Sequence, residues 1–377
     1  MIYYVCFGIS TLFFELSKLL REKNKILEKV LLILGIIIIS LLSYFRDFSI
    51  GTDINVYGNF LFINSTYFSK FSNYLEFIKS DNIELGYSFL NFFVSRFTSN
   101  PHAFYFILSL ITNMCFFFPI FKLRRNVDIS LAWITYLFLF FGYTFNYLRQ
   151  SIALGLTFIS MYYILNNKFL RSVIFLILAI LFHRTAFIIG IVYIEYIYIN
   201  KYGKKVNFKN VFFSVFIILC VVFIMYVYGS NLLSDKYSQY LIQARFSDSS
   251  KVVLGMLVYR LPMIILIYIC MQRERRKKNL LSSSELMLWY LLIYDVIISL
   301  AFFNNSTIMR VSLYFAISKI ISYNLFLEKL FSKHRFIYKT IYVLIIGVIF
   351  FIQVIIQGNN QIYPYKVSDD FSLIKYL

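Results

Sequence analysis

The residues best suited to chemistry are single arginines that stand at the ends of long apolar runs. Arg46, Arg149, Arg184 and Arg310 lie in short turns or directly at the end of a run, and Arg245 lies in a longer connection. A guanidinium stays charged, and its planar fork fits phosphate oxygens in a bidentate way. Placing an arginine at mid-membrane costs about 2.5–3.5 kcal/mol, so an arginine near the membrane is a candidate for a functional role. The set predicts an anion site, with a lipid-linked diphosphate as candidate ligand; the alternative is snorkelling or contact with anionic lipid headgroups.

Proton acceptors are few in this part of the sequence. His183 stands between two short apolar runs, and a neutral imidazole is a competent proton acceptor near pH 7. Glu84 and Asp53 are the acidic candidates, both in the long connection that follows the second apolar run. The alternative for His183 is a polar residue satisfied by packing, and for the acids a solvated charge or a helix cap.

No metal or cofactor site is expected. The sequence shows no convincing acidic pair of the D-x-D type and no histidine cluster. The four cysteines lie inside apolar runs without C-x-x-C spacing, as small packing residues do: Cys6, Cys115, Cys220 and Cys270.

Composition places these residues in a membrane protein. Of 377 residues, 60% are hydrophobic and only 15% are charged, and a single soluble core could not bury that much apolar surface. The net charge of +19 does not indicate nucleic-acid binding, because the basic residues form short clusters between apolar runs.

The apolar runs predict an all-α polytopic membrane protein with about twelve spans in a single domain, 1–377. Two longer connections, 46–100 and 229–255, and the tail 358–377 lie outside the spans. The stretch Gly86–Phe97 is amphipathic and is expected to follow the membrane surface. The predicted spans are 1–17, 29–45, 101–121, 129–147, 150–166, 170–182, 185–199, 210–228, 256–271, 286–303, 311–327 and 338–357.

Charge parity orients the spans. Six alternate connections hold 23 of the 37 Lys and Arg residues, which places these connections in the cytoplasm and both termini outside. The parity holds only if 170–199 forms two short or re-entrant segments that meet at His183-Arg184. The candidate residues then face the outer side of a bacterial inner membrane.

Short motifs in a fixed order resemble those of EpsG-like proteins. The string Arg46-Asp47-Phe48-Ser49-Ile50-Gly51-Thr52-Asp53 with Tyr57 is similar to their R-x(4)-G-T-D-x-x-x-Y pattern. Further elements match over nearly the whole chain: Glu84-Leu85-Gly86-Tyr87, Asn146-x-x-Arg149-Gln150-x-x-Ala153, His183-x-x-Ala186, Arg310-x-x-x-Tyr314-Phe315 and Tyr363-Pro364-Tyr365.

The resemblance implies a polymerase of O-antigen, capsule or exopolysaccharide, a member of the large multi-helix membrane glycosyltransferases. Its substrates would be undecaprenyl-diphosphate-linked oligosaccharides, as donor and acceptor, among membrane lipids, with a chain-length regulator protein as a further partner. We expect Arg149 and Arg310 to bind the donor diphosphate with support from Arg46, and Glu84, His183 or Asp53, in that order, to act on the acceptor hydroxyl. The remaining expected substrate contacts are Arg184, Arg245, Tyr57, Asn146, Gln150, Tyr363 and Tyr365.

Three other functions share some of these features. A ligase that uses the same carrier would need the same arginines. A flippase or other transporter should show an internal repeat and charges along its path, and Asp295 is the one mid-span acid of that kind. A membrane acyltransferase would need a histidine on the cytoplasmic side, whereas His183 is expected outside.

Overall fold

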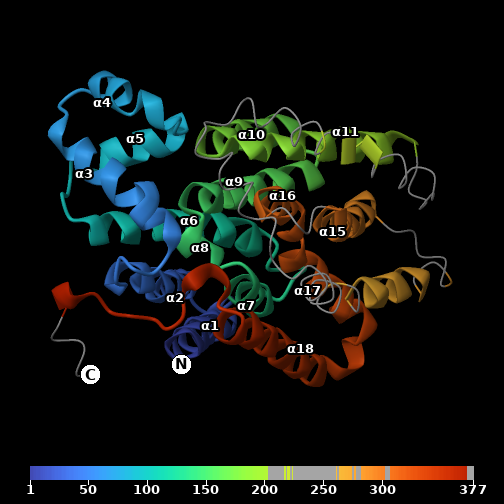
Figure 1. Ribbon diagram of the computed structural model, residues 1–377. Coiled ribbons are helices and arrows are strands. Elements are labelled where there is room, and N and C mark those ends of the chain that lie inside the picture. Colours follow the sequence, from blue (N-terminus) through green and yellow to red (C-terminus); the bar gives the residue numbers. More distant parts are fainter. Residues whose placement is uncertain are drawn as a thin grey trace. The chain divides into compact units, whose positions relative to one another are not determined.

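The structure is a computed structural model that describes residues 1–202, 216–217, 219–220, 223, 260, 263–273, 276, 282–301 and 306–371, and its elements there are helices (Figure 1). The all-α prediction is therefore confirmed for the described residues. Six of the described helices are long and apolar enough to cross a membrane: Ile2–Leu20, Lys25–Phe45, Pro101–Lys122, Leu148–Leu165, Ser283–Ala301 and Arg335–Ile356. The prediction of twelve spans is not confirmed by this number.

The chain forms two compact units. The first comprises Met1–Ile159, Leu178–Arg184 and His334–Leu377, and the second comprises Ser160–Ile177 and Thr185–Lys333. Most of the predicted span 210–228 and part of 256–271 lie outside the described residues, which include a helix at Met263–Arg273.

Five apolar helices that pack on one another build the first unit. Their contacts join α1 to α2 and α7, α2 to α6, and α7 to α18 (Figure 1). Side chains at their starts satisfy first-turn amides: Asn24 caps α2, Asn100 caps α6 and Asp128 caps α7. The helices are α1 (Ile2–Leu20), α2 (Lys25–Phe45), α6 (Pro101–Lys122), α7 (Ile129–Leu139) and α18 (Arg335–Phe350), and α18 continues into the π-helical turn Phe351–Ile356.

The long connection after α2 is mostly helical. It contains the π-helical turn Ile54–Gly58 and three helices too short to span a membrane: α3 (Asn59–Tyr67), α4 (Phe71–Phe77) and α5 (Leu85–Val94). The helix α5 contacts both α3 and α4 (Figure 1), and it covers most of the stretch that the sequence predicted to be amphipathic.

Several predicted spans are interrupted. The predicted span 129–147 divides into α7 and the short helix α8 (Tyr143–Asn146). The predicted span 311–327 divides into α16 (Ser306–Ala316) and α17 (Lys319–Leu330). The predicted break between 170–182 and 185–199 is present: α10 (Phe169–Phe182) ends just before His183, and α11 (Ile189–Tyr202) follows a 3-10 turn.

The second unit holds α11, α15 (Ser283–Ala301), α16 and α17, and parts of α9 (Leu148–Leu165) and α10. Its buried Asp295 accepts Arg260 Nε at 2.9 Å and Lys319 Nζ at 2.5 Å through the same oxygen. An ion group of this kind ties helices together, because a buried carboxylate is stable only when it is paired.

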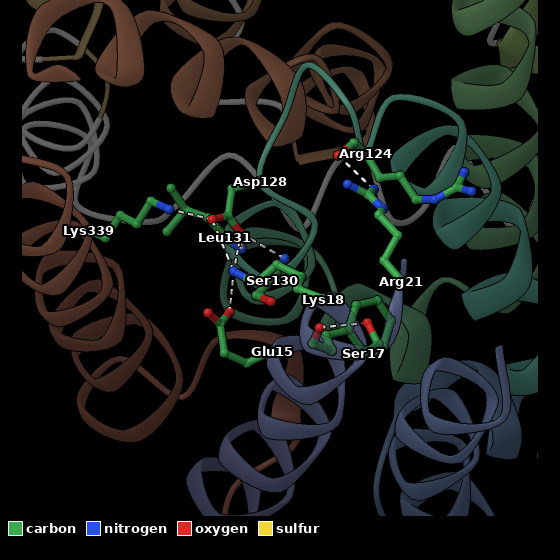
Figure 2. Close-up of polar contacts among 10 residues, drawn as sticks. Glu15, Ser17, Lys18, Arg21, Arg124, Asp128, Ser130, Leu131 and Lys339 are labelled. Carbon is green, nitrogen blue, oxygen red and sulfur yellow. Dashed lines mark hydrogen bonds and ion pairs between the residues drawn. The ribbon is translucent and has the colours of Figure 1, made fainter. Parts of the chain in front are cut away.

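Basic residues gather at one end of the first unit. Asp128 accepts the amides of Ser130 and Leu131, and its carboxylate also contacts the ammonium groups of Lys18 and Lys339 (Figure 2). The carboxylate thereby joins the starts of α7 and α18 to the end of α1. Close by along the same ends, Arg21 Nη2 donates to the carbonyl of Arg124 at 2.8 Å (Figure 2).

The C-terminal tail is bound at the opposite end of the same helices. The Tyr3 hydroxyl, near the start of α1, donates to Ile362 O at 2.8 Å. After α2, Asp47 N donates to Lys366 O at 2.9 Å, and Ser368 N donates to Phe45 O at 2.9 Å. Residues up to Phe371 are thus held over the end of α2, away from the basic end.

We predict that Asp128→Ala lowers the stability of the first unit. Losing the helix cap alone costs about 1–2 kcal/mol. Lys18 and Lys339 also lose their contact with the carboxylate, although Lys18 keeps its ion pair with Glu15. Burial raises the pKa of Asp128, but the charge of Lys18 and the contact with Lys339 lower it by more than burial raises it. The net shift of the pKa is therefore downward from 3.8. The stabilisation is therefore present above pH about 4 and is lost as the pH falls below that value.

Thermal unfolding of detergent-purified protein at pH 7 measures the effect. The exposed Glu76→Ala on α4 is the matched control, since it also removes one carboxylate from the unit. Equal melting temperatures for the two variants would contradict the role assigned to Asp128.

Candidate functional site

The carboxylate of Glu84 brings three distant parts of the sequence together in the first unit. Arg149 Nη1, in the first turn of α9, donates to Glu84 Oε2 at 2.5 Å. His183 Nδ1 lies 3.1 Å from Glu84 Oε1, and the backbone amide of Arg184 donates to the same oxygen at 3.4 Å. Glu84 and Arg149 are each only 8% exposed. Two of the three sequence candidates for proton transfer and one candidate anion ligand therefore form one cluster.

The environment keeps Glu84 ionised. Burial raises the pKa of this carboxyl, but the hydrogen bond with His183 and the positive charge of Arg149 outweigh burial and lower the pKa from 4.5 to about 2. A carboxylate with so low a pKa is a weak base. Glu84 is better suited to hold its two partners than to remove a proton.

The same contact fixes the histidine. Because a carboxylate only accepts hydrogen bonds, Nδ1 of His183 must carry the proton. In the neutral imidazole, Nε2 then keeps its lone pair, and the structure shows no hydrogen bond from Nε2 to a described residue. The His183 side chain is 21% exposed, so part of the ring can be reached by a ligand.

Arg149 is also stacked on an aromatic ring. Its guanidinium carbon lies 4.6 Å from the centre of the Tyr57 ring, and the Tyr57 hydroxyl donates to Asp53 Oδ2. Asp53 Oδ2 further accepts the amide of Leu148 at 3.1 Å. Asp53 thus lies beside the cluster through Tyr57 and Leu148, and no described contact joins Asp53 to Glu84 or His183.

Close backbone approaches at two glycines hold the cluster together. A Cβ on Gly51 would lie 2.3 Å from Phe145 O, and the φ of +93° there disfavours other residues. A Cβ on Gly86 would lie 2.8 Å from Leu181 O, at the end of α10 next to His183. Both glycines stand in the short motifs, but no role was predicted for either of them. Each glycine lies two residues from a candidate acid, Asp53 or Glu84, and this spacing could have indicated that it belongs to the site.

Arg46 is placed differently from Arg149. It is 1% exposed, and its guanidinium lies against the rings of Phe145, at 4.4 Å, and Tyr105, at 5.1 Å. Burial lowers the pKa of Arg46 from 12.5 to about 10, although the surrounding tyrosines act in the opposite direction. The tail bridges to Arg46 through Val367, so this arginine is enclosed in the structure.

The other residues predicted to contact substrate lie in several different parts of the structure. Asn146 and Gln150 are buried beside Arg149, and Arg184 Nη2 donates to Asn82 Oδ1 at 2.7 Å. The Tyr365 hydroxyl donates to Leu42 O at 2.8 Å, whereas Tyr363 is 46% exposed. Arg310 lies on α16 of the second unit, where Thr185 donates to Tyr314 one turn further along that helix.

Arg245 and the whole predicted loop 229–255 lie outside the described residues. Among the described residues, no group of three or more His, Cys, Asp or Glu side chains is arranged to hold a metal ion.

We predict that Glu84→Gln destabilises the first unit at neutral pH, because Arg149 is left buried without its counter-charge. The ion pair stabilises the fold above the ordinary pKa of 4.5 and loses its effect as the pH falls towards 2. Wild type and variant should therefore differ in melting temperature at pH 7 and converge below about pH 4. A constant difference across this range would contradict the assigned ionisation. Glu76→Ala is again the control.

Comparison with known proteins adds the family. The sequence model of the EpsG family matches residues 29–367, nearly the whole chain. Neither the curated proteins nor the solved structures give a match. The matched range includes Arg46, Glu84, Arg149 and His183, the residues that define the geometry above. The chain belongs to the EpsG family, a family of polysaccharide-polymerase type.

Proposed function

We propose that this chain is a polysaccharide polymerase that transfers a glycan from undecaprenyl diphosphate to a lipid-linked repeat unit. The observation that carries the proposal is the shared Glu84 carboxylate, which holds a cation and an imidazole side by side. Such a pair can stabilise a leaving diphosphate and accept a proton from a hydroxyl. The family supports a polymerase-type glycosyltransferase in general terms.

The reaction needs one proton acceptor. In the proposed step, Nε2 of His183 takes the proton of the acceptor hydroxyl while the hydroxyl oxygen bonds to the anomeric carbon of the donor glycan. The bond from this carbon to the diphosphate oxygen breaks, and undecaprenyl diphosphate leaves with the electron pair. Glu84 stabilises the imidazolium that forms, as a carboxylate behind a histidine does in other acid–base sites. Geometry thus favours His183 over Glu84 and Asp53 as the base.

The departing diphosphate needs positive charge. Arg149 is already oriented by Glu84 and Tyr57, so little reorganisation is required when charge develops. We propose Arg184 as a further diphosphate contact and Gln150 as a contact of the same ligand. That Arg310 binds diphosphate stays a prediction from the sequence. The exposed ring of Tyr363 is suited to packing on a sugar ring.

The two ends of the first unit support a proposal for the location of the site. The basic residues Lys18, Arg124 and Lys339 lie at one end, and the tail lies at the other, together with the 46–57 segment that contacts Arg149. The positive-inside rule assigns the basic end to the cytoplasm. We therefore propose that the site faces the outside of the inner membrane, where membrane lipids present the carrier and a chain-length regulator is a further partner.

The direct test supplies purified protein in lipid nanodiscs with an undecaprenyl-diphosphate-linked oligosaccharide. The proposal predicts a ladder of lipid-linked products that persists in the presence of a chelator. A single transfer to an added acceptor other than the lipid-linked unit would indicate a ligase. Movement of the lipid across the bilayer without new glycosidic bonds would indicate a transporter. Loss of the ladder on chelation, restored by magnesium or manganese, would reveal a metal requirement.

Two variants test the assigned roles in the same assay. Arg149→Lys keeps the charge but loses the planar fork, so we expect the turnover to fall by at least about tenfold. His183→Ala should lose most of the turnover and retain donor binding. Lys79→Arg, an exposed change outside the cluster, is the control. Wild-type ladders from both test variants would contradict the mechanism.

A further inference from the structure

The segment 46–57 meets the segment 145–149 at successive positions. Arg46 Nη1 donates to Phe145 O at 3.3 Å, and Thr52 N donates to Asn146 Oδ1 at 2.9 Å. Further along, the amide of Leu148 donates to Asp53. The contacts run in the same order on both segments, and they end where the Tyr57 ring lies under Arg149.

We propose that residues 46–57 are a positioning element for Arg149. In this inference, which rests on the proposed function, Arg46 and Asp53 act on the reaction through the 145–149 turn and do not touch substrate. They are positioning residues, not catalytic ones. The R-x(4)-G-T-D-x-x-x-Y motif would then serve to position Arg149, a role that its charged residues alone do not suggest.

Asp53 caps the start of α9, although it lies in a distant segment of the chain. Leu148 is the first residue of α9, so its amide has no acceptor within the helix. The Asp53 carboxylate supplies that acceptor and places a negative charge at the positive end of the helix. Arg149 is the next residue, so the direction of its side chain depends on how this first turn is held.

Arg46 fixes the residue just before the turn. Its guanidinium both donates to the carbonyl of Phe145 and lies on the Phe145 ring at 4.4 Å. Since Arg46 is 1% exposed and the tail covers it, a substrate phosphate has no access to it in this structure. Its charge therefore serves the fold of the turn.

Asn146 connects the turn to the C-terminal tail. Its Oδ1 accepts Thr52 N, and its Nδ2 donates to Asn360 O. The turn is thus held between segment 46–57 on one side and the tail on the other. Gly51 allows this contact, because any side chain there would displace Phe145 O.

Asp53→Asn and Asp53→Ala separate positioning from catalysis. An asparagine carbonyl at the same place can still accept the Leu148 amide and the Tyr57 hydroxyl, whereas alanine cannot. We expect Asp53→Asn to keep kcat within about threefold of wild type and Asp53→Ala to lose at least about tenfold, the effect of removing a cap and misplacing a charged group. If Asp53→Asn is as inactive as Asp53→Ala, the charge of Asp53 itself is required and the inference fails.

A binding measurement gives a second readout that does not depend on polymer formation. Inorganic diphosphate is the probe, and its affinity for the purified protein is measured for wild type, Arg149→Ala and Asp53→Ala. The inference predicts that Asp53→Ala weakens diphosphate binding by about the same factor as Arg149→Ala. Wild-type affinity in folded Asp53→Ala would overturn it. If wild type itself binds diphosphate but makes no ladder, the proposed function fails while this inference can still be judged.

Gly51→Ala tests the contact from the backbone side, with Gly8→Ala as the control. A Cβ on Gly8, in α1, would meet nothing within 4 Å, whereas a Cβ on Gly51 would collide with Phe145 O. Gly51→Ala should reproduce the loss of diphosphate affinity seen in Asp53→Ala, and Gly8→Ala should match wild type. Undiminished affinity in Gly51→Ala would contradict the proposed role of the segment.

Discussion

The buried ion pair of Arg149 with Glu84 is the interaction on which the candidate site in the first unit depends. Each residue is 8% exposed, so the pair is withdrawn from most of the water that would otherwise solvate it. Removing one partner of such a pair costs about 3–5 kcal/mol, because the other charge stays behind uncompensated. The segments that carry the two residues, and the end of α10 with His183, must therefore meet at one place.

This constraint explains features that otherwise look unrelated. Gly86 lets the start of α5 approach the backbone of Leu181, which places Glu84 within reach of His183. Gly51 lets the segment 46–57 approach Phe145, which places the Tyr57 ring against the Arg149 guanidinium. These close approaches orient the charged groups of the site before a ligand arrives.

Much of this arrangement could be predicted from the sequence. Apolar runs predicted the helices of the first unit, and the break at His183 followed from charge parity. Glu84, Arg149 and His183, which lie together in the structure, are among the residues that the sequence singled out, and their roles stay predictions. These predictions rest on local pattern and on the cost of charge near lipid, and both can be read from one chain.

Other features depend on contacts between distant segments, and no local pattern shows them. Asp53 was predicted as a candidate base, but it caps the helix of Arg149 from a different part of the chain. Arg46 was predicted as a diphosphate contact, and the structure encloses it under the tail, whose fixed path over α2 carries no signal in the sequence. The interruptions at α8 and between α16 and α17 were also missed, because the apolar pattern continues through them.

The coupling between Glu84 and Arg149 is the central claim, and a double-mutant cycle measures it most directly. Turnover and diphosphate affinity are measured for wild type, Glu84→Gln, Arg149→Met and the double variant. If the carboxylate acts by holding the guanidinium, the two effects are strongly non-additive, and the double variant is little worse than Arg149→Met. Effects that add in full would show that the two residues act independently, and would contradict the account.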